Sequence, residues 1–385
     1  MNPFQFRAPT IVFANGSSAR LQEAANGRLG ERVLFVTDEG LRRLGLCDAA
    51  LASLTAAGIT PMVFSDVEPD PSLKTLLKAV EAGQAAGVTG VIGFGGGSSL
   101  DVAKLAALLL GSAEEIEAAW GVNNAKGPRL PLVLVPTTAG TGSEVTPISI
   151  ITVGENEKKG VSSPLILPDL AVLDPELTLG LPPAITAATG MDAMVHAIEA
   201  YTSKNANNNP MSRTLAREAL RLLGANIQIA VFDGANLAAR SAMLLGSMLA
   251  GQAFANSPVA AVHALAYPVG GTFHVPHGLS NALVLPHVLR FNAPEAAGLY
   301  AEIAADAFPD LEREPSVQAK CVGFIESLAT LSSLLGMKMR LRDVGVNEHH
   351  LRQMAKDAMK QQRLLVNNPR PMTENDALAI YRAAW

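Results

Sequence analysis

The chain has 385 residues and a formal net charge of −5, with 49% hydrophobic and 17% charged residues. This length and composition indicate a well-packed globular protein of two domains, and the acidic balance argues against a nucleic-acid or anionic-membrane partner. The two cysteines are far apart and form no disulfide framework, and the N-terminus lacks a signal-peptide pattern, which together favour the cytoplasm.

The first half of the chain alternates short apolar runs with amphipathic segments. This alternation is typical of a parallel sheet with helices on both faces, whose ligands bind beyond the carboxyl ends of the strands. Pro71 suits the first turn of a helix. Strands are expected at 32–37, 61–65, 88–94, 132–135, 148–152 and 171–173, and helices at 38–58, 71–86 and 100–110.

The pattern becomes helical after a pair of prolines at 182–183 and stays helical to the end of the chain. We therefore expect an α/β domain at 1–181 and an all-helical domain at 182–385, with the boundary near Leu181. Helices are expected at 183–201, 211–225, 234–254, 257–266, 277–290, 293–306, 314–335, 347–360 and 373–383.

A glycine-rich loop, Gly95-Gly96-Gly97-Ser98-Ser99, follows the strand expected at 88–94. Glycines allow a ligand to approach the backbone closely, and the following helix N-terminus presents N–H groups to an anion, so the loop is a candidate phosphate site. Either serine has an alternative role as the cap of that helix. The loop matches neither the Rossmann fingerprint, which belongs to the first strand–helix turn, nor the Walker loop, which needs a lysine.

A second loop, at 136–144, also follows a strand and carries Thr137, Thr138 and Thr141 among glycines. Two hydroxyl- and glycine-rich loops at neighbouring strand ends predict a pyrophosphate site, with a pair of plain tight turns as the alternative. Asp38 follows the first predicted strand, where an acidic side chain in dinucleotide-binding folds accepts hydrogen bonds from the ribose. Its alternative role, compatible with the first, is to cap the next helix.

Five of the seven histidines lie between 190 and 287. Asp192 and His196 are four residues apart, which places both side chains on one face of a helix, and His263 and His277 offer two further imidazoles. No Lys, Arg, Asp or Glu occurs from 241 to 289, so buried histidines there need partners or a metal. The spacing is compatible with one divalent cation, and ordinary core or surface histidines are the alternative.

Five segments, in the same order, resemble the iron-containing (group III) alcohol dehydrogenases, which include lactaldehyde reductase and 1,3-propanediol dehydrogenase. The segments are 95–101, 136–144, 174–178, 187–199 and 276–288. The resemblance implies an NAD-binding α/β domain followed by an all-helical metal-binding domain, as in the architecture of dehydroquinate synthase. It also implies hydride transfer between a small alcohol or aldehyde and NAD, with Fe²⁺, Zn²⁺ or another divalent metal, in a homodimer formed through an N-terminal strand near 3–7.

The resemblance also implies roles for individual residues. Phe254 resembles a residue of the substrate pocket, and Lys158 a residue that reaches the cofactor, with Lys159 as the alternative. The implied metal ligands, of which the last two also belong to the catalytic centre, are Asp192, His196, His263 and His277. The remaining implied cofactor residues are Asp38, Gly95, Gly96, Gly97, Ser98, Ser99, Asp101, Thr137, Thr138 and Thr141.

One position departs from the family. Many members carry a histidine where this chain has Tyr267, four residues after His263, and that histidine has been assigned a proton-relay or packing role beside the metal. A tyrosine donates a hydrogen bond but keeps its proton at neutral pH, because its reference pKa is about 10. His274 is a second candidate for the relay, with a solvent-facing or capping role as the alternative.

Two other activities occur on this architecture. Maleylacetate reductases use no metal, and the presence of all four ligands argues against that activity. Dehydroquinate synthase is a lyase whose substrate needs many basic residues, and the relevant segments here are poor in Lys and Arg. An apolar pocket that includes Phe254 and Ile148 favours a small alcohol or aldehyde as the substrate.

Overall fold

The computed structural model describes residues 3–25, 27–154 and 157–385. The chain divides into two compact units. The α/β unit consists of Ala8–Thr138 and Gly142–Leu179. The helical unit consists of Gly180–Trp385, the short segment Ala139–Thr141 and the N-terminal segment up to Arg7. Among the described residues, no helix is long and apolar enough to cross a membrane.

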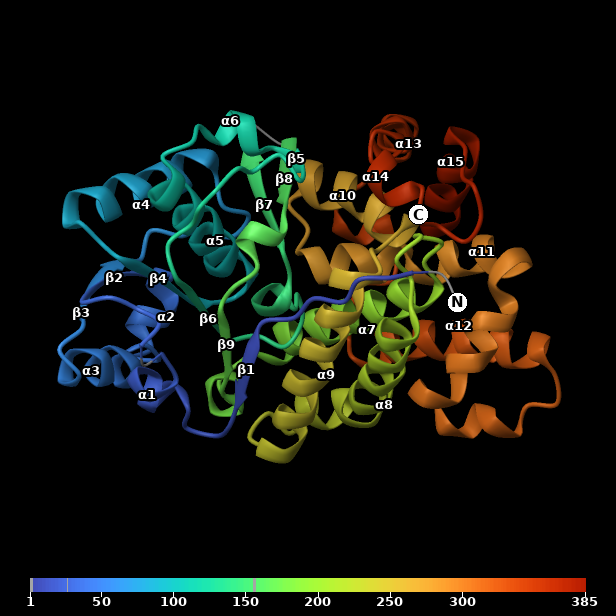
Figure 1. Ribbon diagram of the computed structural model, residues 1–385. Helices are drawn as coiled ribbons and strands as arrows, with labels where there is room; N and C mark the ends of the chain where they lie inside the picture. The colour runs from blue at the N-terminus through green and yellow to red at the C-terminus, as the bar shows by residue number, and fades with distance from the viewer. Residues whose placement is uncertain (1–2, 26, 155–156) are drawn as a thin grey trace. The chain divides into compact units, whose positions relative to one another are not determined.

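A six-stranded sheet forms the centre of the α/β unit, and every neighbouring pair of its strands is parallel (Figure 1). The strand order is β1-β9-β6-β4-β2-β3. The strands are β1 (Thr10–Phe13), β2 (Arg32–Val36), β3 (Thr60–Phe64), β4 (Gly90–Gly95), β6 (Leu132–Pro136) and β9 (Leu170–Leu173). The helices of this unit are α1 (Leu21–Ala25), α2 (Glu39–Arg43), α3 (Asp48–Ala56), α4 (Leu73–Ala86), α5 (Gly97–Ser112) and α6 (Ile116–Ala119).

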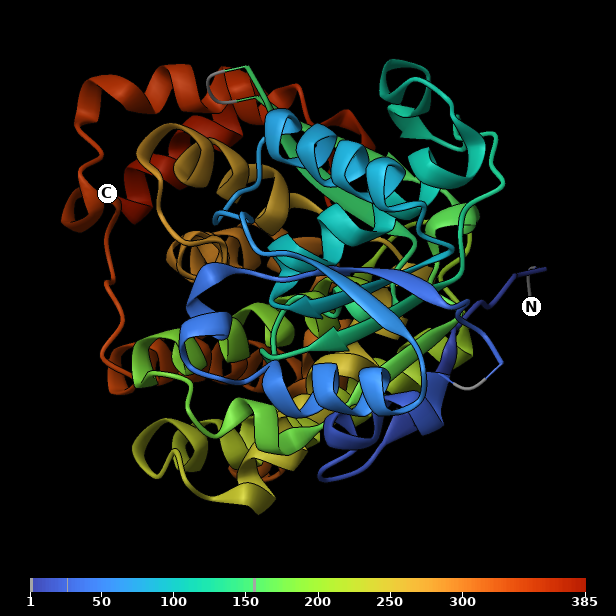
Figure 2. The same cartoon turned by 90° about the vertical axis from the view of Figure 1, so that its left-hand side faces the viewer.

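Both faces of this sheet are covered by helices (Figure 2). Leu34 and Val36 of β2 pack with α4 and α5 in one core cluster, whereas Val33 and Phe35 pack with α1 and α3 in another. Alternate residues of a strand point to opposite faces, so a continuous apolar run such as β2 supplies both cores. This arrangement, with the helical second unit, confirms the predicted fold class.

A second, three-stranded sheet has the order β5-β8-β7. It comprises β5 (Gly121–Val122), β7 (Ile148–Val153) and β8 (Glu157–Ser162), with β7 and β8 antiparallel. The strand expected at 148–152 therefore belongs to this sheet. Its partner β8 was not predicted, because a sequence that begins Glu-Lys-Lys-Gly has no apolar alternation.

Two predicted helices of the α/β unit differ from the structure. The helix expected at 38–58 is two helices, α2 and α3, because the chain turns between them at Gly45, which adopts φ of +70°. Pro71 does not begin a helix: α4 begins at Leu73, and the side chain of Ser72 caps it. A serine cap satisfies a free N–H group at the helix start, which a proline cannot do.

The helical unit is arranged around α7 (Pro183–Thr202), in which every residue from Gly190 to Thr202 is buried. The predicted helices at 277–290 and 293–306 are one helix, α11, which continues through two prolines. The other helices are α8 (Pro210–Phe232), α9 (Leu237–Asn256), α10 (Ala261–Phe273), α11 (His277–Ala307), α12 (Val317–Leu334), α13 (Leu351–Met359), α14 (Gln362–Leu365) and α15 (Glu374–Ala384). Short 3-10 helices lie at Ser18–Arg20, Ser143–Val145, Pro164–Ile166, Pro175–Thr178, Pro309–Arg313, Leu341–Val344 and Glu348–His350.

Helices α7 and α11 approach each other to backbone contact at Gly278. A Cβ atom at Gly278 would lie 2.1 Å from the carbonyl oxygen of Ala188 and 3.2 Å from Cβ of Asp192. No side chain fits in this space, so the glycine sets how close the start of α11 lies to α7.

We predict that Gly278→Ala lowers the free energy of unfolding by about 1–3 kcal/mol or more, because the two helices must separate to admit the methyl group. Thermal and urea unfolding measure the effect. Gly298→Ala on the same helix is the matched control, since no atom lies within 4 Å of its added Cβ. The control should be neutral or stabilising by up to about 1 kcal/mol, and equal effects of the two substitutions would contradict the close-contact interpretation.

Candidate metal and cofactor sites

The helical unit gathers the four side chains that were predicted as metal ligands. Asp192 and His196 lie one turn apart on α7, His263 lies near the start of α10, and His277 is the first residue of α11. One ligand atom from each residue lies within 4.8 Å of the others. The side chain of His277 is 41% exposed and the other three are buried, so the cluster is accessible from the His277 side.

The protonation states in this cluster suit a cation. Burial lowers the pKa of His196 to about 3, so its imidazole is neutral and carries a free lone pair. Burial alone raises the pKa of Asp192, but the neighbouring imidazoles and a hydrogen bond from Asn281 outweigh it, and the net shift is downward. Three imidazoles and one ionised carboxylate are a donor set that fits Fe²⁺, Zn²⁺ or a similar divalent ion.

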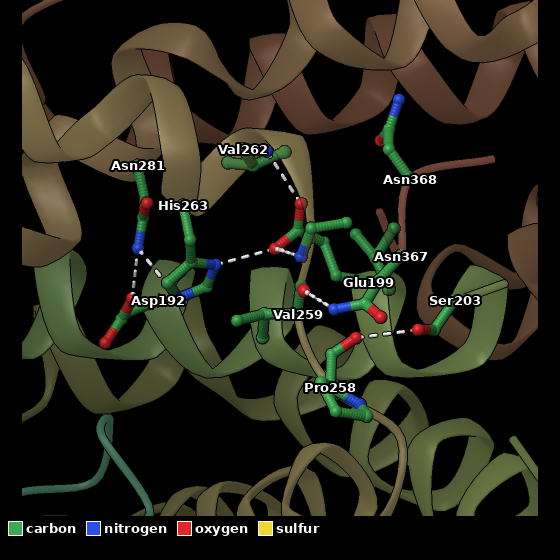
Figure 3. A network of polar contacts seen from close by, with 12 residues as sticks. Asp192, Glu199, Ser203, Pro258, Val259, Val262, His263, Asn281, Asn367 and Asn368 are labelled. Carbon is green, nitrogen blue, oxygen red and sulfur yellow. Dashed lines mark hydrogen bonds and ion pairs between the residues drawn. The ribbon is translucent and has the colours of Figure 1, made fainter. Parts of the chain in front are cut away.

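Glu199 was not predicted, yet it holds His263 in place (Figure 3). Its carboxylate lies 2.6 Å from Nδ1 of His263 and accepts hydrogen bonds from the backbone N–H groups of Ala260 and Val262. A carboxylate at Nδ1 fixes the tautomer and leaves Nε2 free as a ligand atom. Its position seven residues after Asp192 on the same helix face was the sequence signal that could have identified it.

Asn281 is a second residue that sequence reasoning missed. It is fully buried on α11, one turn after His277, and its Nδ2 donates to Oδ1 of Asp192 at 2.6 Å (Figure 3). The same nitrogen lies 3.4 Å from Nε2 of His263 and 3.3 Å from Nε2 of His277. The four-residue spacing from His277 was the available signal.

The three other predicted catalytic residues, Phe254, Tyr267 and His274, lie in three different environments. Phe254 stacks on His196, with ring centroids 4.4 Å apart. Tyr267 is half-buried, its ring lies 6.2 Å from that of His277, and its hydroxyl lies 3.4 Å from a guanidinium nitrogen of Arg363. His274 is exposed and ends α10 with φ of +54°, which is a helix-capping conformation.

Within the α/β unit, the first predicted phosphate loop lies beside the start of the second, at Thr137 and Thr138. The backbone N–H of Thr137 donates to the carbonyl of Gly95, and a Cβ at Gly96 would lie 3.6 Å from the side chain of Thr138. Helix α5 begins at Gly97 with Gly96 as its cap, so Ser98 and Ser99 lie inside the helix and do not cap it. The capping alternative for these serines is therefore wrong.

The remaining predicted cofactor residues have partners within the protein. Oδ1 of Asp38 accepts a hydrogen bond from the backbone N–H of Leu41, so Asp38 caps α2 at the end of β2. Lys158 forms an ion pair with Asp70 at 2.6 Å and donates to Thr152. Thr141 lies in the segment Ala139–Thr141 that belongs to the helical unit.

Lys104, which sequence reasoning also missed, connects the two loops from inside the α/β unit. Its fully buried ammonium group donates to the hydroxyls of Ser143 and Thr146 and to the carbonyl of Ile148. Asp101 accepts from Ser143 at 2.6 Å and lies 3.7 Å from the ammonium group. Burial lowers the pKa of Lys104 to about 8, and the nearby carboxylates offset part of this effect.

Both halves of the chain match models of known families. Residues 8–175 match the model described as iron-containing alcohol dehydrogenase, and residues 186–385 match the C-terminal model of the Fe-containing alcohol dehydrogenase family. The long-chain-alcohol dehydrogenase 1 of Geobacillus thermodenitrificans is 42% identical over 93% of this chain and 91% of that protein.

Solved structures give the same result. A 1,3-propanediol oxidoreductase matches with a TM-score of 0.95 and 35% identity over 100% of both chains. A sulfoacetaldehyde reductase from Bifidobacterium kashiwanohense, solved in complex with NAD⁺, matches with a TM-score of 0.87 and 28% identity over 99% of this chain and 98% of that one. The fold, the family models and the relatives therefore define an oxidoreductase of the alcohol dehydrogenase type. More narrowly, the chain belongs to the iron-containing alcohol dehydrogenase family, which confirms the resemblance found in the sequence.

We predict that Lys104→Met destabilises the protein by about 3–5 kcal/mol, because it removes a fully buried ammonium group from its acceptors and leaves the partly buried carboxylate of Asp101 without its cation. Adding Asp101→Asn should recover part of the loss, which a double-mutant cycle with urea unfolding measures. Lys78→Met, at an exposed position of α4, is the control and should change stability by less than about 0.5 kcal/mol. Additive effects of the two internal substitutions would show that the pair is not coupled.

Proposed function

We propose that this alcohol dehydrogenase interconverts a small alcohol and its aldehyde with NAD(H), using one divalent cation, preferably Fe²⁺. The observation that carries the proposal is the convergence of Asp192, His196, His263 and His277. When bound, the cation would polarise the alcohol or carbonyl oxygen, and the nicotinamide would accept or donate the hydride.

The protein's own residues orient and shield this chemistry. Glu199 keeps Nε2 of His263 free, and the lowered pKa of Asp192 keeps its carboxylate ionised. Phe254 forms an apolar wall against His196, while substrate approaches from the exposed side of His277. We assign Tyr267, whose ring lies 6.2 Å from that of His277, to hydrogen bonding at the substrate, because its hydroxyl group can donate.

The α/β unit is our proposed cofactor-binding domain, with the functional boundary near Leu181. The adjoining loops at Gly95–Ser99 and Thr137–Thr138 offer backbone N–H groups and hydroxyls for the pyrophosphate. Asp38, at the end of β2, accepts the adenine ribose hydroxyls in addition to capping α2. Lys158 would contact the cofactor only by leaving its ion pair with Asp70.

We further propose a homodimer formed through residues 3–7. Backbone groups of Gln5 and Arg7 are bonded to the side-chain amides of Asn207 and Asn256. In an extended segment alternate residues direct their backbone groups to opposite edges, so the edge opposite the asparagines is available to a second chain.

The experiment that tests the function is an NAD(H)-linked activity screen over short and long alcohols, diols and their aldehydes, with Fe²⁺ or Zn²⁺ supplied. His263→Ala should abolish turnover and most bound metal while the circular dichroism spectrum stays unchanged. Turnover that survives thorough chelation would instead favour the metal-independent reductase alternative. If His263→Ala loses the metal but the wild type produces no NADH from any alcohol, the metal site stands and the proposed reaction is refuted.

Cofactor choice follows from Asp38. An ionised carboxylate at the ribose repels the additional phosphate of NADP(H), and each 1.4 kcal/mol of such repulsion is about tenfold in affinity. We predict a preference for NAD(H), and that Asp38→Asn and Asp38→Gly both reduce it by at least about tenfold in the ratio of kcat/KM values. Asparagine keeps the cap of α2 and glycine removes it, so the pair separates charge from helix stability. A wild-type enzyme that prefers NADP(H) would refute the assignment.

A further inference from the structure

We propose that Asn281 is a positioning residue for the metal site, acting through the ligand Asp192 and contacting two of the histidines. The proposal rests on the metal-dependent function proposed above and adds Asn281 to the four ligands and Glu199. Its side-chain nitrogen lies 2.6 Å from Asp192, 3.3 Å from His277 and 3.4 Å from His263. A single amide group therefore touches three of the four ligands.

The hydrogen bond to Asp192 restrains a side chain that otherwise has little to orient it. The carboxylate is buried, and a buried carboxylate needs a donor for each oxygen that does not face a cation. The Nδ2–H group of Asn281 supplies a donor to Oδ1. This hydrogen bond limits rotation of the carboxylate about χ2. The orientation of the second oxygen, Oδ2, is therefore set by the protein and not by the metal.

The two imidazole contacts place the amide of Asn281 beside the nitrogen atoms that would bind the cation. Glu199 faces Nδ1 of His263, so Nε2 is the ring atom that faces this amide, at 3.4 Å. Asn281 and His277 lie one turn apart at the start of α11, where Gly278 allows the helix to touch α7 beside Asp192. The close contact of α11 with α7 thus positions Asp192 on one helix, and His277 and the amide of Asn281 on the other.

The hydrogen bonding of Asn281 is not what a purely structural buried amide shows. Its Oδ1 is buried and has no hydrogen-bond partner among the described residues, which costs stability. Asn292, eleven residues later on the same helix, provides the comparison. Its amide exchanges two hydrogen bonds with that of Asn368, so both of its polar ends are satisfied. The orphaned oxygen of Asn281 indicates that its position serves the ligands at some cost to the fold.

The test measures metal binding directly, with Co²⁺ as the probe. Asn281→Leu removes the donor at similar volume, and Asn281→Ala does so without risk of overpacking. Both should bind Co²⁺ about 10–100-fold more weakly than the wild type and lose it faster to a chelator. The visible absorption bands of the bound Co²⁺ should also shift, because the freed carboxylate changes the coordination geometry, and a merely structural role would not move this spectrum.

Asn292→Leu is the matched control, since it breaks a buried amide pair on the same helix away from the ligands. It should lower the melting temperature and leave Co²⁺ affinity and spectrum unchanged. Folded Asn281 variants that bind Co²⁺ within about twofold of the wild type, with the same spectrum, would overturn the proposal. Equal losses of affinity in the Asn292 variant would do so too, whereas retention of metal by His263→Ala would refute the proposed site itself.

Discussion

Two carboxylates buried on one apolar helix impose the main physical constraint on the helical unit. Asp192 and Glu199 both lie on the buried part of α7, and among the described residues their ion-pair partners are histidines, with no Lys or Arg. Transferring a carboxylate into an apolar interior without compensation costs many kcal/mol. Glu199 is compensated by two backbone N–H groups and His263, whereas Asp192 receives one amide and lies among imidazoles. The imbalance at Asp192 is what a divalent cation would correct.

The α/β unit meets a related constraint with the opposite charge. Lys104 carries its ammonium group into a fully buried position and finds three oxygen acceptors and the carboxylate of Asp101. Those acceptors lie at the end of the second glycine-rich loop and just after it, while the lysine belongs to the helix that follows the first loop. The buried charge therefore fixes the spacing of two loops that lie at adjacent strand ends, which is the spacing that a pyrophosphate would have to match.

The sequence was most informative about features that depend on the regular spacing of residues along a strand or a helix. The apolar runs predicted five of the six parallel strands and missed β1, and the four-residue step from Asp192 to His196 predicted two side chains on one helix face. It was least informative for contacts across long stretches of chain. Lys104 contacts residues about forty positions away, and no local pattern distinguishes it from a surface lysine. Asn281 contacts Asp192 across 89 positions, and its four-residue spacing from His277 is a local signal that does not reveal this contact. The polar strand β8 was missed for the related reason that its register is set by pairing with β7 and not by its own composition.

Most of the interactions that orient the proposed ligands do not depend on the ion itself. His263 is oriented by Glu199, Asp192 by Asn281, and His277 by the contact of α11 with α7 at Gly278. In small zinc domains, by contrast, the metal supplies the folding free energy, and the apo chain is unfolded. Here a large apolar core holds α7, and hydrogen bonds add the final alignment, so we expect the chain to fold without the ion. The proposed site would then be selective through its donor geometry, and exchange among similar divalent ions would depend on ligand type and availability more than on the stability of the fold.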